Sequence, residues 1–190
     1  MKRQQETEKL IMGIDPGTNI MGYAVIKAKN ANKTPELIVS GVLDMIKLKD
    51  PYIKLERIFE RTLSVIDTYH PDELAIEAPF FGKNIQSMLK LGRAQGVAIA
   101  AALQRKIPIF EYAPLKIKMS ITGNGNASKE QIAALLGILM KIPSTPSRLD
   151  ETDAIAIAYC HHIQGKLPTE GGAKCRNWGD YIKKYPDKLL

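Results

Sequence analysis

The sequence predicts an α/β fold built on a five-stranded mixed sheet, and two observations lead to that prediction. Three apolar segments near the N-terminus are separated only by turns, which is typical of an antiparallel meander. Beyond them, segments of helical periodicity alternate with two further short apolar segments, which is typical of parallel strands joined by helices. The strands are expected at residues 10–14, 21–28, 36–43, 73–77 and 108–110.

Turn and cap residues set the limits of the first elements. Residues 15–19 (Asp-Pro-Gly-Thr-Asn) hold strong turn formers and separate the first two strands. Polar residues 30–35 separate the second strand from the third. Asp50 is expected to cap the first helix, with Pro51 in its first position, and apolar residues recur at helical spacing up to Tyr69.

The later helices are indicated by periodicity and by one strong cap. Gln131 follows Ser128 at the spacing of a capping box. The helices are expected from Ser87 to Arg105, from Pro114 to Ile121, from Ser128 to about Met140 and from Asp150 to Gln164. We therefore divide the chain into an N-terminal extension (1–9), a folded domain (10–164) and a basic C-terminal tail (165–190).

Composition limits the class of protein. The 190 residues suffice for one domain with a substantial core, and 45% hydrophobic residues argue against disorder. No apolar run approaches the roughly 20 residues needed to span a membrane, and we expect a cytoplasmic protein. Cys160 and Cys175 form no CxxC motif, which argues against a disulfide scaffold and a structural zinc site.

The chain is basic, with a formal net charge of +7 and a pI near 9.3. Such a charge fits a polyanionic partner, but it fits a generic basic protein equally well. A basic chain that also carries an acidic pocket is typical of metal-dependent nucleases. Their carboxylates hold cations at the scissile phosphate while lysines and arginines hold the rest of the backbone.

Four acidic residues are the candidates for such a pocket. Asp15 and Glu77 end two strands that are expected to be parallel neighbours, and Asp150 and Asp153 share one helix face. Singly, they could be a turn residue, a strand end and a helix N-terminus favoured by the dipole. Together they offer oxygen ligands suited to Mg²⁺ or Mn²⁺, and two such ions about 4 Å apart can drive phosphodiester hydrolysis.

At this point a resemblance to a known family is visible. The chain resembles the RuvC family of Holliday junction resolvases, in the RNase H-like superfamily. The motifs that carry the resemblance are Gly13-Ile-Asp-Pro-Gly-Thr18, Ala75-Ile-Glu77, the block 82–99, Thr122-Gly-Asn-Gly125 and residues 150–158 (Asp-Glu-Thr-Asp-Ala-Ile-Ala-Ile-Ala).

The resemblance implies a three-layer RNase H-like fold and a homodimer that makes paired, symmetric nicks across a four-way DNA junction. It implies that Asp15, Glu77, Asp150 and Asp153 bind two Mg²⁺ ions per subunit, with Mn²⁺ as an alternative. It also implies a branch-migration helicase partner of the RuvA–RuvB kind.

The resemblance further suggests DNA contacts. Phe80 falls where the family places an aromatic wedge, although Phe81 beside it leaves open which ring faces the junction. The residues expected to contact phosphates are Lys83, Lys90, Arg93, Lys118 and Lys129. A core phenylalanine and solvated surface charges are the simpler explanations. The small face Gly92, Gly96 and Ala100 would serve either a dimer interface or the contact with the sheet.

Three other functions remain open from the sequence. An actin-like ATPase or sugar kinase also has an Asp-Gly-Thr turn after its first strand, but it needs two copies of the fold. A non-catalytic DNA-binding module would keep the lysines and lose an acid, whereas all four acids are present. A related RNase H-like nuclease would act on RNA or duplex DNA, and only the block 82–99 argues for junctions.

Overall fold

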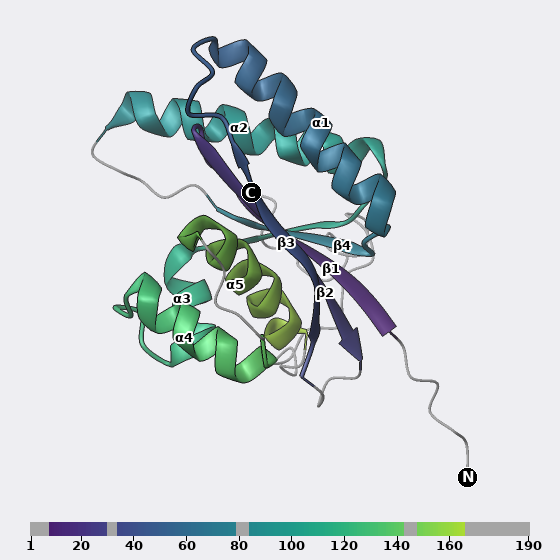
Figure 1. Ribbon diagram of the computed structural model, residues 1–190, viewed down its shortest axis with the longest axis vertical. Coiled ribbons are helices and arrows are strands. Elements are labelled where there is room, and N and C mark those ends of the chain that lie inside the picture. The colour runs from purple at the N-terminus through teal and green to yellow at the C-terminus, as the bar shows by residue number, and fades with distance from the viewer. Residues whose placement is uncertain (1–7, 30–33, 79–83, 143–147, 166–190) are drawn as a thin grey trace, which may run out of the picture.

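A computed structural model describes residues 8–29, 34–78, 84–142 and 148–165, and they form one five-stranded sheet. The strand order is β3-β2-β1-β4-β5. Strands β1 to β3 form an antiparallel meander, while β4 and β5 run parallel to β1, so the predicted mixed sheet is confirmed (Figure 1). The strands are β1 (Glu8–Asp15), β2 (Ile20–Lys29), β3 (Glu36–Asp44), β4 (Glu73–Glu77) and β5 (Ile109–Tyr112).

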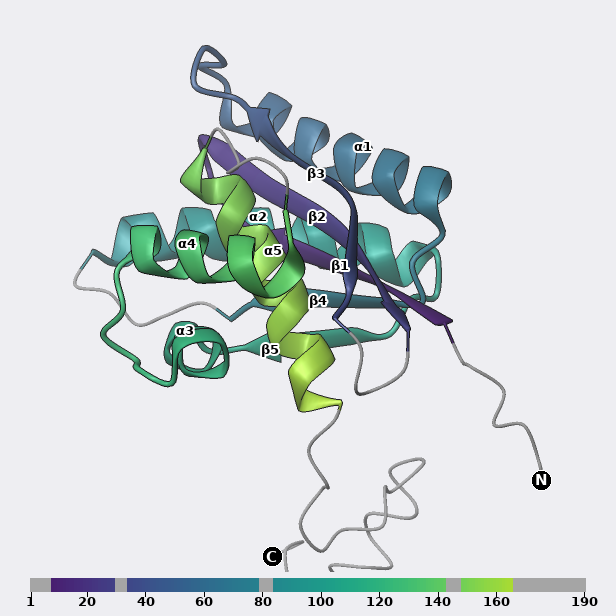
Figure 2. The same cartoon turned by 60° about the horizontal axis from the view of Figure 1, so that its bottom comes forward.

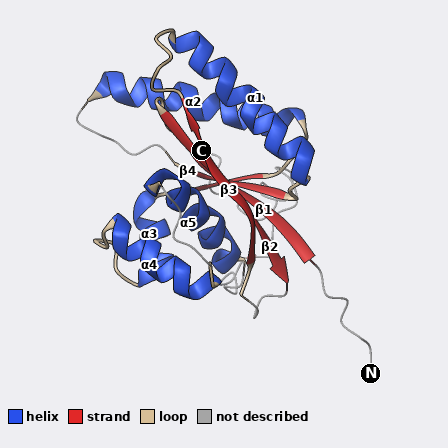
Figure 3. Cartoon of the chain, in the orientation of Figure 1, coloured by secondary structure: helices blue, strands red, loops and turns tan. Residues whose placement is uncertain are grey.

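Helices cover both faces of the sheet, which gives the three layers that the family resemblance implies. Helices α1 and α2 lie on one face, and α3, α4 and α5 on the other (Figures 2 and 3). The helices are α1 (Pro51–Tyr69), α2 (Ile85–Gln104), α3 (Pro114–Thr122), α4 (Lys129–Met140) and α5 (Leu149–Gln164). Within the described ranges, no helix is both long and apolar enough to cross a membrane.

The alternation of side chains along each strand divides the core in two. Met12 and Ile14 of β1 pack with α1 and α2, whereas Ile11 packs with α3, α4 and α5. The same alternation separates Leu74 from Ala75 in β4. Odd-numbered positions of β1 and β4 therefore face α5, including the strand-end acids.

The predicted caps are confirmed at two helices. The side chain of Asp50 accepts a hydrogen bond of 2.7 Å from the backbone N–H of Tyr52, directly after Pro51 opens α1. Ser128 and Gln131 form both hydrogen bonds of a capping box at the start of α4. These local signals fix where the two helices begin.

Three boundaries differ clearly from the predictions. Strand β1 begins at Glu8 instead of Leu10, because its antiparallel ladder with β2 extends to the pair Glu8–Lys29, so residues 8 and 9 belong to the folded domain and not to the predicted extension. Helix α2 begins at Ile85 instead of Ser87, because the side chain of Asn84 caps it by accepting from the backbone N–H of Ser87 at 3.1 Å. Strand β5 continues to Tyr112, because its parallel ladder with β4 extends to the pair Glu77–Tyr112. Most of the two predicted terminal segments, residues 1–7 and 166–190, lies outside the described residues.

Helix α5 lies unusually close to the sheet, and two glycines permit it. A Cβ atom at Gly13 of β1 would stand 2.2 Å from the carbonyl oxygen of Ala154. A Cβ atom at Gly22 of β2 would stand 2.0 Å from the carbonyl oxygen of Asp150. Any side chain at either position would push α5 away from the strands.

This contact predicts a large cost for Gly13→Ala. The added methyl group meets helix backbone, which cannot rotate away, so we expect a loss of about 3 kcal/mol in the free energy of unfolding. The matched control is Gly137→Ala in α4, where an added Cβ has no neighbour within 4 Å and where alanine favours the helix by about 1 kcal/mol. Denaturant unfolding of both variants measures the difference. Equal stability of the two variants would contradict the close packing of α5.

Candidate active site

The strand-end acids and the acids of α5 meet on one face of the sheet. Asp15 ends β1 and Glu77 ends β4, and both strands present these positions to α5. Asp15, Glu77 and Asp153 line one cavity of about 210 Å³. Residues of α3 and α4 close it, among them Lys118 and Lys129. The structure thus joins three of the four predicted acids in a single cavity.

Asp150 lies beside this cavity but does not line it. Its carbonyl oxygen rests on Gly22, and Gly22 is the partner of Asp15 in the β1–β2 ladder. The negative charge of Asp150 still helps to raise the pKa of Asp15. The fourth predicted acid is therefore a close electrostatic neighbour of the other three.

The crowding of carboxylates changes their protonation. Burial, as the largest cause, and the charges of Asp153, Glu77 and Asp150 together raise the pKa of Asp15 to about 7, against the opposing charge of Lys129. Burial and the charge of Asp153 also raise the pKa of Glu77. Like charges in a partly buried site disfavour each other's ionised form. A cation in the cavity would relieve that repulsion.

Two lysines already bring positive charge into the cavity. The Lys129 ammonium group forms an ion pair with the carboxylate of Asp153. Burial opposes the charge of Lys129, but the hydrogen bond that its ammonium group donates to Asp153 and the charges of Asp153, Asp15 and Asp150 outweigh it, so the pKa of Lys129 is raised. The ammonium group of Lys118 donates to the carbonyl oxygen of Ala127 at 3.0 Å and lies within electrostatic range of Glu77.

The acids are neighbours, but their side chains are not arranged in a metal-coordinating geometry. Among the described residues, no three His, Cys, Asp or Glu side chains are close enough together to hold a metal ion. Lys129 pairs with one of the acids, Asp153. The donor set nevertheless fits a hard cation, because it consists of carboxylate oxygens on a rigid support. Mg²⁺ is of this kind.

Gln95 of α2 is a positioning residue that the sequence did not reveal. Its side chain is only 5% exposed, and its Nε2 donates to the carbonyl oxygen of Glu77 at 3.2 Å and to the carboxylate of Glu111 at 3.3 Å. These bonds tie the end of β4 to α2. The only signal in the sequence is a single amide within a run of small residues.

The far end of α5 is held by a polar network. His161 Nε2 donates to Glu73 at 2.5 Å, so Nδ1 accepts from the Tyr112 hydroxyl at 2.6 Å, and Lys9 pairs with Glu73. Burial lowers the pKa of His161, which favours the neutral ring that this pattern requires. His161 lies about 12 Å along the helix from Asp153. It therefore anchors α5 and takes no part in the carboxylate cavity.

The six predicted DNA contacts fall into three groups. Lys118 and Lys129 line the carboxylate cavity, and Lys90 and Arg93 are exposed on α2. Phe80 and Lys83, like Phe81 beside them, lie outside the described residues. The contacts themselves stay predictions.

The small face of α2 does not contact the sheet. An added Cβ at Gly92 or Gly96 would meet nothing within 4 Å, and Ala100 is exposed. The residues that α2 buries are Ala94, Gln95, Ala98, Ala101 and Ala102. Of the two uses predicted for the small face, packing on the sheet is therefore wrong.

A mixed sheet of this order, with acids at the ends of β1 and β4 and an acidic helix lying across them, defines an RNase H-like nuclease fold. The sequence model of the family described as crossover junction endodeoxyribonuclease RuvC matches residues 11–161. This chain belongs to that family.

Individual relatives agree with the assignment. The crossover junction endodeoxyribonuclease RuvC of Christiangramia forsetii is 56% identical over 185 residues, covering 97% of this chain and 94% of the relative. The protein of the same name from Bacteroides fragilis is 56% identical over 189 residues, covering 98% of each chain. Among solved structures, Thermus thermophilus RuvC in complex with a Holliday junction substrate aligns with a TM-score of 0.77 at 28% identity, covering 83% of this chain and 95% of that one.

The raised pKa of Asp15 predicts how stability depends on pH in the metal-free protein. Between its ordinary value of 3.8 and about 7, the folded chain holds a proton that the unfolded chain has lost. The free energy of unfolding should therefore fall as the pH rises through this window and level off above it.

Asp15→Asn removes this contribution. As the pH rises from 5 to 8 in the presence of a chelator, the free energy of unfolding should fall by roughly 1–3 kcal/mol less in the variant than in the parent chain. Denaturant unfolding at several pH values measures both curves. Curves that stay parallel over the whole range would show that Asp15 titrates near its ordinary pKa.

Proposed function

We propose that this chain is an endodeoxyribonuclease that resolves Holliday junctions by paired, symmetric nicks in DNA recombination and repair. The observation that carries the proposal is the cavity in which Asp15, Glu77 and Asp153 meet two lysines, in a chain of the RuvC family. A solved relative with a TM-score of 0.77 is a RuvC bound to a Holliday junction substrate, which supports a junction as the substrate here too. Such a substrate implies a cytoplasmic location.

The family consists of metal-dependent nucleases, and we assign the metal to the carboxylate cavity. Asp15, Glu77, Asp150 and Asp153 would hold two Mg²⁺ ions per subunit, with Mn²⁺ as an alternative. Bound there, the ions would supply the Lewis acid that makes water a nucleophile and stabilises the leaving oxygen.

The side chains of the cavity prepare it for this ligand. Asp15, whose pKa is about 7, must lose its proton to act as an oxygen ligand. Lys129 must release Asp153, which frees its ammonium group for the DNA phosphate. Lys118 stays fixed by the carbonyl oxygen of Ala127 and supplies a second positive charge beside Glu77.

Paired nicks require two active sites, and α2 offers a surface for a second copy of the chain. Ile85 and Leu89 are 72% and 60% exposed, and the open positions Gly92 and Gly96 continue the same helix face. Apolar side chains followed by small residues allow two helices to approach closely. We therefore assign this face to a homodimer interface, and a RuvA–RuvB helicase remains the expected further partner.

The four acids should be needed for cleavage and not for binding. Asp15→Asn, Glu77→Gln, Asp150→Asn and Asp153→Asn are each expected to reduce cleavage of a synthetic four-way junction at least 100-fold. Binding rests on basic residues, so each variant should bind the junction within about threefold of the parent chain when metal is chelated. Gel mobility and single-turnover cleavage measure the two quantities.

The matched control is Glu56→Gln, which removes an exposed acid of α1 far from the cavity. It should cleave and bind as the parent chain does. Loss of binding in all four acid variants, with the control intact, would contradict the assignment of cleavage to the acids and of DNA binding to the basic residues.

Substrate choice separates this proposal from its main alternative, an RNase H-like nuclease acting on RNA or duplex DNA. With Mg²⁺, the chain should cut a four-way junction and leave a linear duplex and an RNA–DNA hybrid intact, and a chelator should stop all cleavage. Equal cutting of the linear duplex or the hybrid would favour the alternative. A chain that binds the junction without cutting it would be a non-catalytic module.

A further inference from the structure

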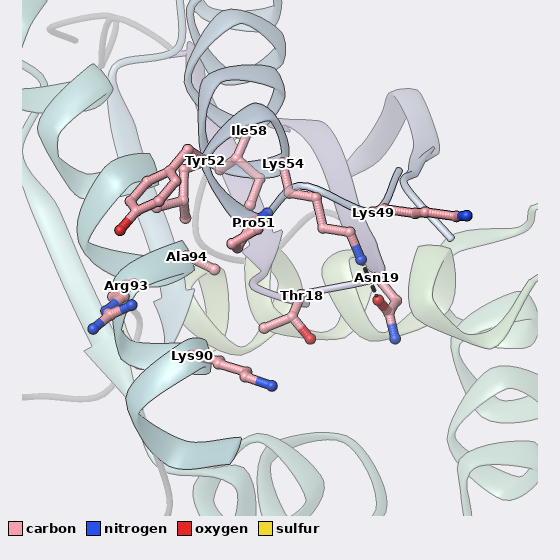
Figure 4. Close-up of a pocket in the computed structure, with 11 residues that line it drawn as sticks. Thr18, Asn19, Lys49, Pro51, Tyr52, Lys54, Ile58, Lys90, Arg93 and Ala94 are labelled. Carbon is pink, nitrogen blue, oxygen red and sulfur yellow. Dashed lines mark hydrogen bonds between the residues drawn. The ribbon is translucent and has the colours of Figure 1, made fainter. Parts of the chain in front are cut away.

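A second pocket lies on the opposite face of the sheet from the carboxylate cavity. It measures about 310 Å³ and opens between the β1–β2 turn, the first turns of α1 and the first half of α2 (Figure 4). Its lining residues are Thr18, Asn19, Lys49, Pro51, Tyr52, Lys54, Leu55, Ile58, Lys90, Arg93 and Ala94. None of these residues lines the carboxylate cavity.

The charge of this pocket is of one sign. Four of its lining residues are cations from separate parts of the chain, and none is acidic: Lys49, Lys54, Lys90 and Arg93. The ammonium group of Lys54 is held in place by a 2.6 Å hydrogen bond to the side-chain oxygen of Asn19. Cations gathered in one concavity repel each other unless an anion binds among them.

The same pocket is also lined by one aromatic ring. Tyr52, in the first turn of α1, is 73% exposed and lines the pocket on the same side of the view as Arg93 (Figure 4). A phosphate ion or an acidic peptide would need only the positive charge. A nucleotide uses both features, because its phosphate pairs with the cations and its base stacks on the ring. The combination therefore points to single-stranded nucleic acid.

The pocket and the carboxylate cavity lie at the two sides of the β1–β2 turn. Asp15 lines the cavity and Thr18 lines the pocket, and three residues of chain keep their Cα atoms within about 11 Å of each other. This distance is a few nucleotides of DNA. A strand lying at the carboxylates can continue over the β1–β2 turn and reach the pocket.

We propose that this pocket holds an unpaired nucleotide of the DNA strand next to the cleavage site. The base stacks on Tyr52, and the flanking phosphates pair with Lys54, Lys90 and Arg93. The inference rests on the proposed junction nuclease function and adds to it a place where one base is kept out of the duplex stack.

The test uses the full-length chain with a chelator, so that no cleavage occurs. The probes are a single-stranded oligonucleotide and a four-way junction, each with one 2-aminopurine, placed in the junction as an unpaired base beside the crossover. Stacking on a tyrosine quenches the fluorescence of 2-aminopurine. We expect the parent chain to quench both probes on binding.

Three variants isolate the ring. Tyr52→Ala should weaken binding of the single strand about tenfold, the size of one lost base–aromatic stack, and abolish the quenching. Tyr52→Phe keeps the ring and should behave as the parent chain does. Ile53→Ala removes the next exposed side chain of α1, which does not line the pocket, and is the matched control.

Two further variants test the cations. Lys90→Ala and Arg93→Ala should each weaken binding and reduce the slope of log affinity against log salt by about one, as expected for one phosphate contact. Unchanged affinity and quenching in Tyr52→Ala would overturn the proposal. So would a loss of affinity in the lysine and arginine variants alone, since the pocket would then hold duplex backbone.

The readout is independent of cleavage. If the chain fails to cut junctions but Tyr52 still quenches the bound base, the pocket stands and the junction nuclease function falls. If the chain cuts junctions and Tyr52→Ala binds and quenches like the parent chain, the pocket assignment falls alone.

Discussion

Helix α5 rests directly on the backbone of β1 and β2, and the assembly of the acidic cavity depends on that contact. Gly13 and Gly22 leave no side chain between helix and sheet, so the carbonyl oxygens of Ala154 and Asp150 reach the strands. Because Gly22 pairs with Asp15, the helix delivers Asp150 and Asp153 to the acid at the end of β1. At the other end of α5, the network around His161 keeps the helix from sliding.

The site that this packing creates is unfavourable by itself. Burial and neighbouring carboxylates raise the pKa of Asp15 to about 7, and Lys129 serves as the counter-ion of Asp153. Two apolar cores, one on each face of the sheet, hold the acids together in spite of their repulsion. Binding sites commonly carry such local strain where the surrounding fold is stable. The carboxylates and lysines of the cavity are therefore already in place before a cation or a phosphate binds.

Periodicity and caps made most of the fold predictable from the sequence, whereas contacts between distant segments were not. The expectation that β1 and β4 are parallel neighbours predicted that Asp15 and Glu77 share an edge, and Ser128 with Gln131 marked the start of α4. The sequence did not predict that β5 continues beyond Phe110, because Glu111 is polar and the length of the strand is set by its pairing with β4. Helical spacing placed Asp150 and Asp153 on one face, but it could not tell that only Asp153 lines the cavity. Nothing local signals the contact of Gln95 with Glu77.

We propose that the four acids, brought together by α5, form one metal-binding site. Titration of Mn²⁺ followed by electron paramagnetic resonance of the free ion tests it without DNA. We expect two ions to bind per chain, with binding weakened at least tenfold in Asp15→Asn and in Asp153→Asn while Glu56→Gln binds as the parent chain does. Equal Mn²⁺ affinity in the parent chain and in both acid variants would contradict it.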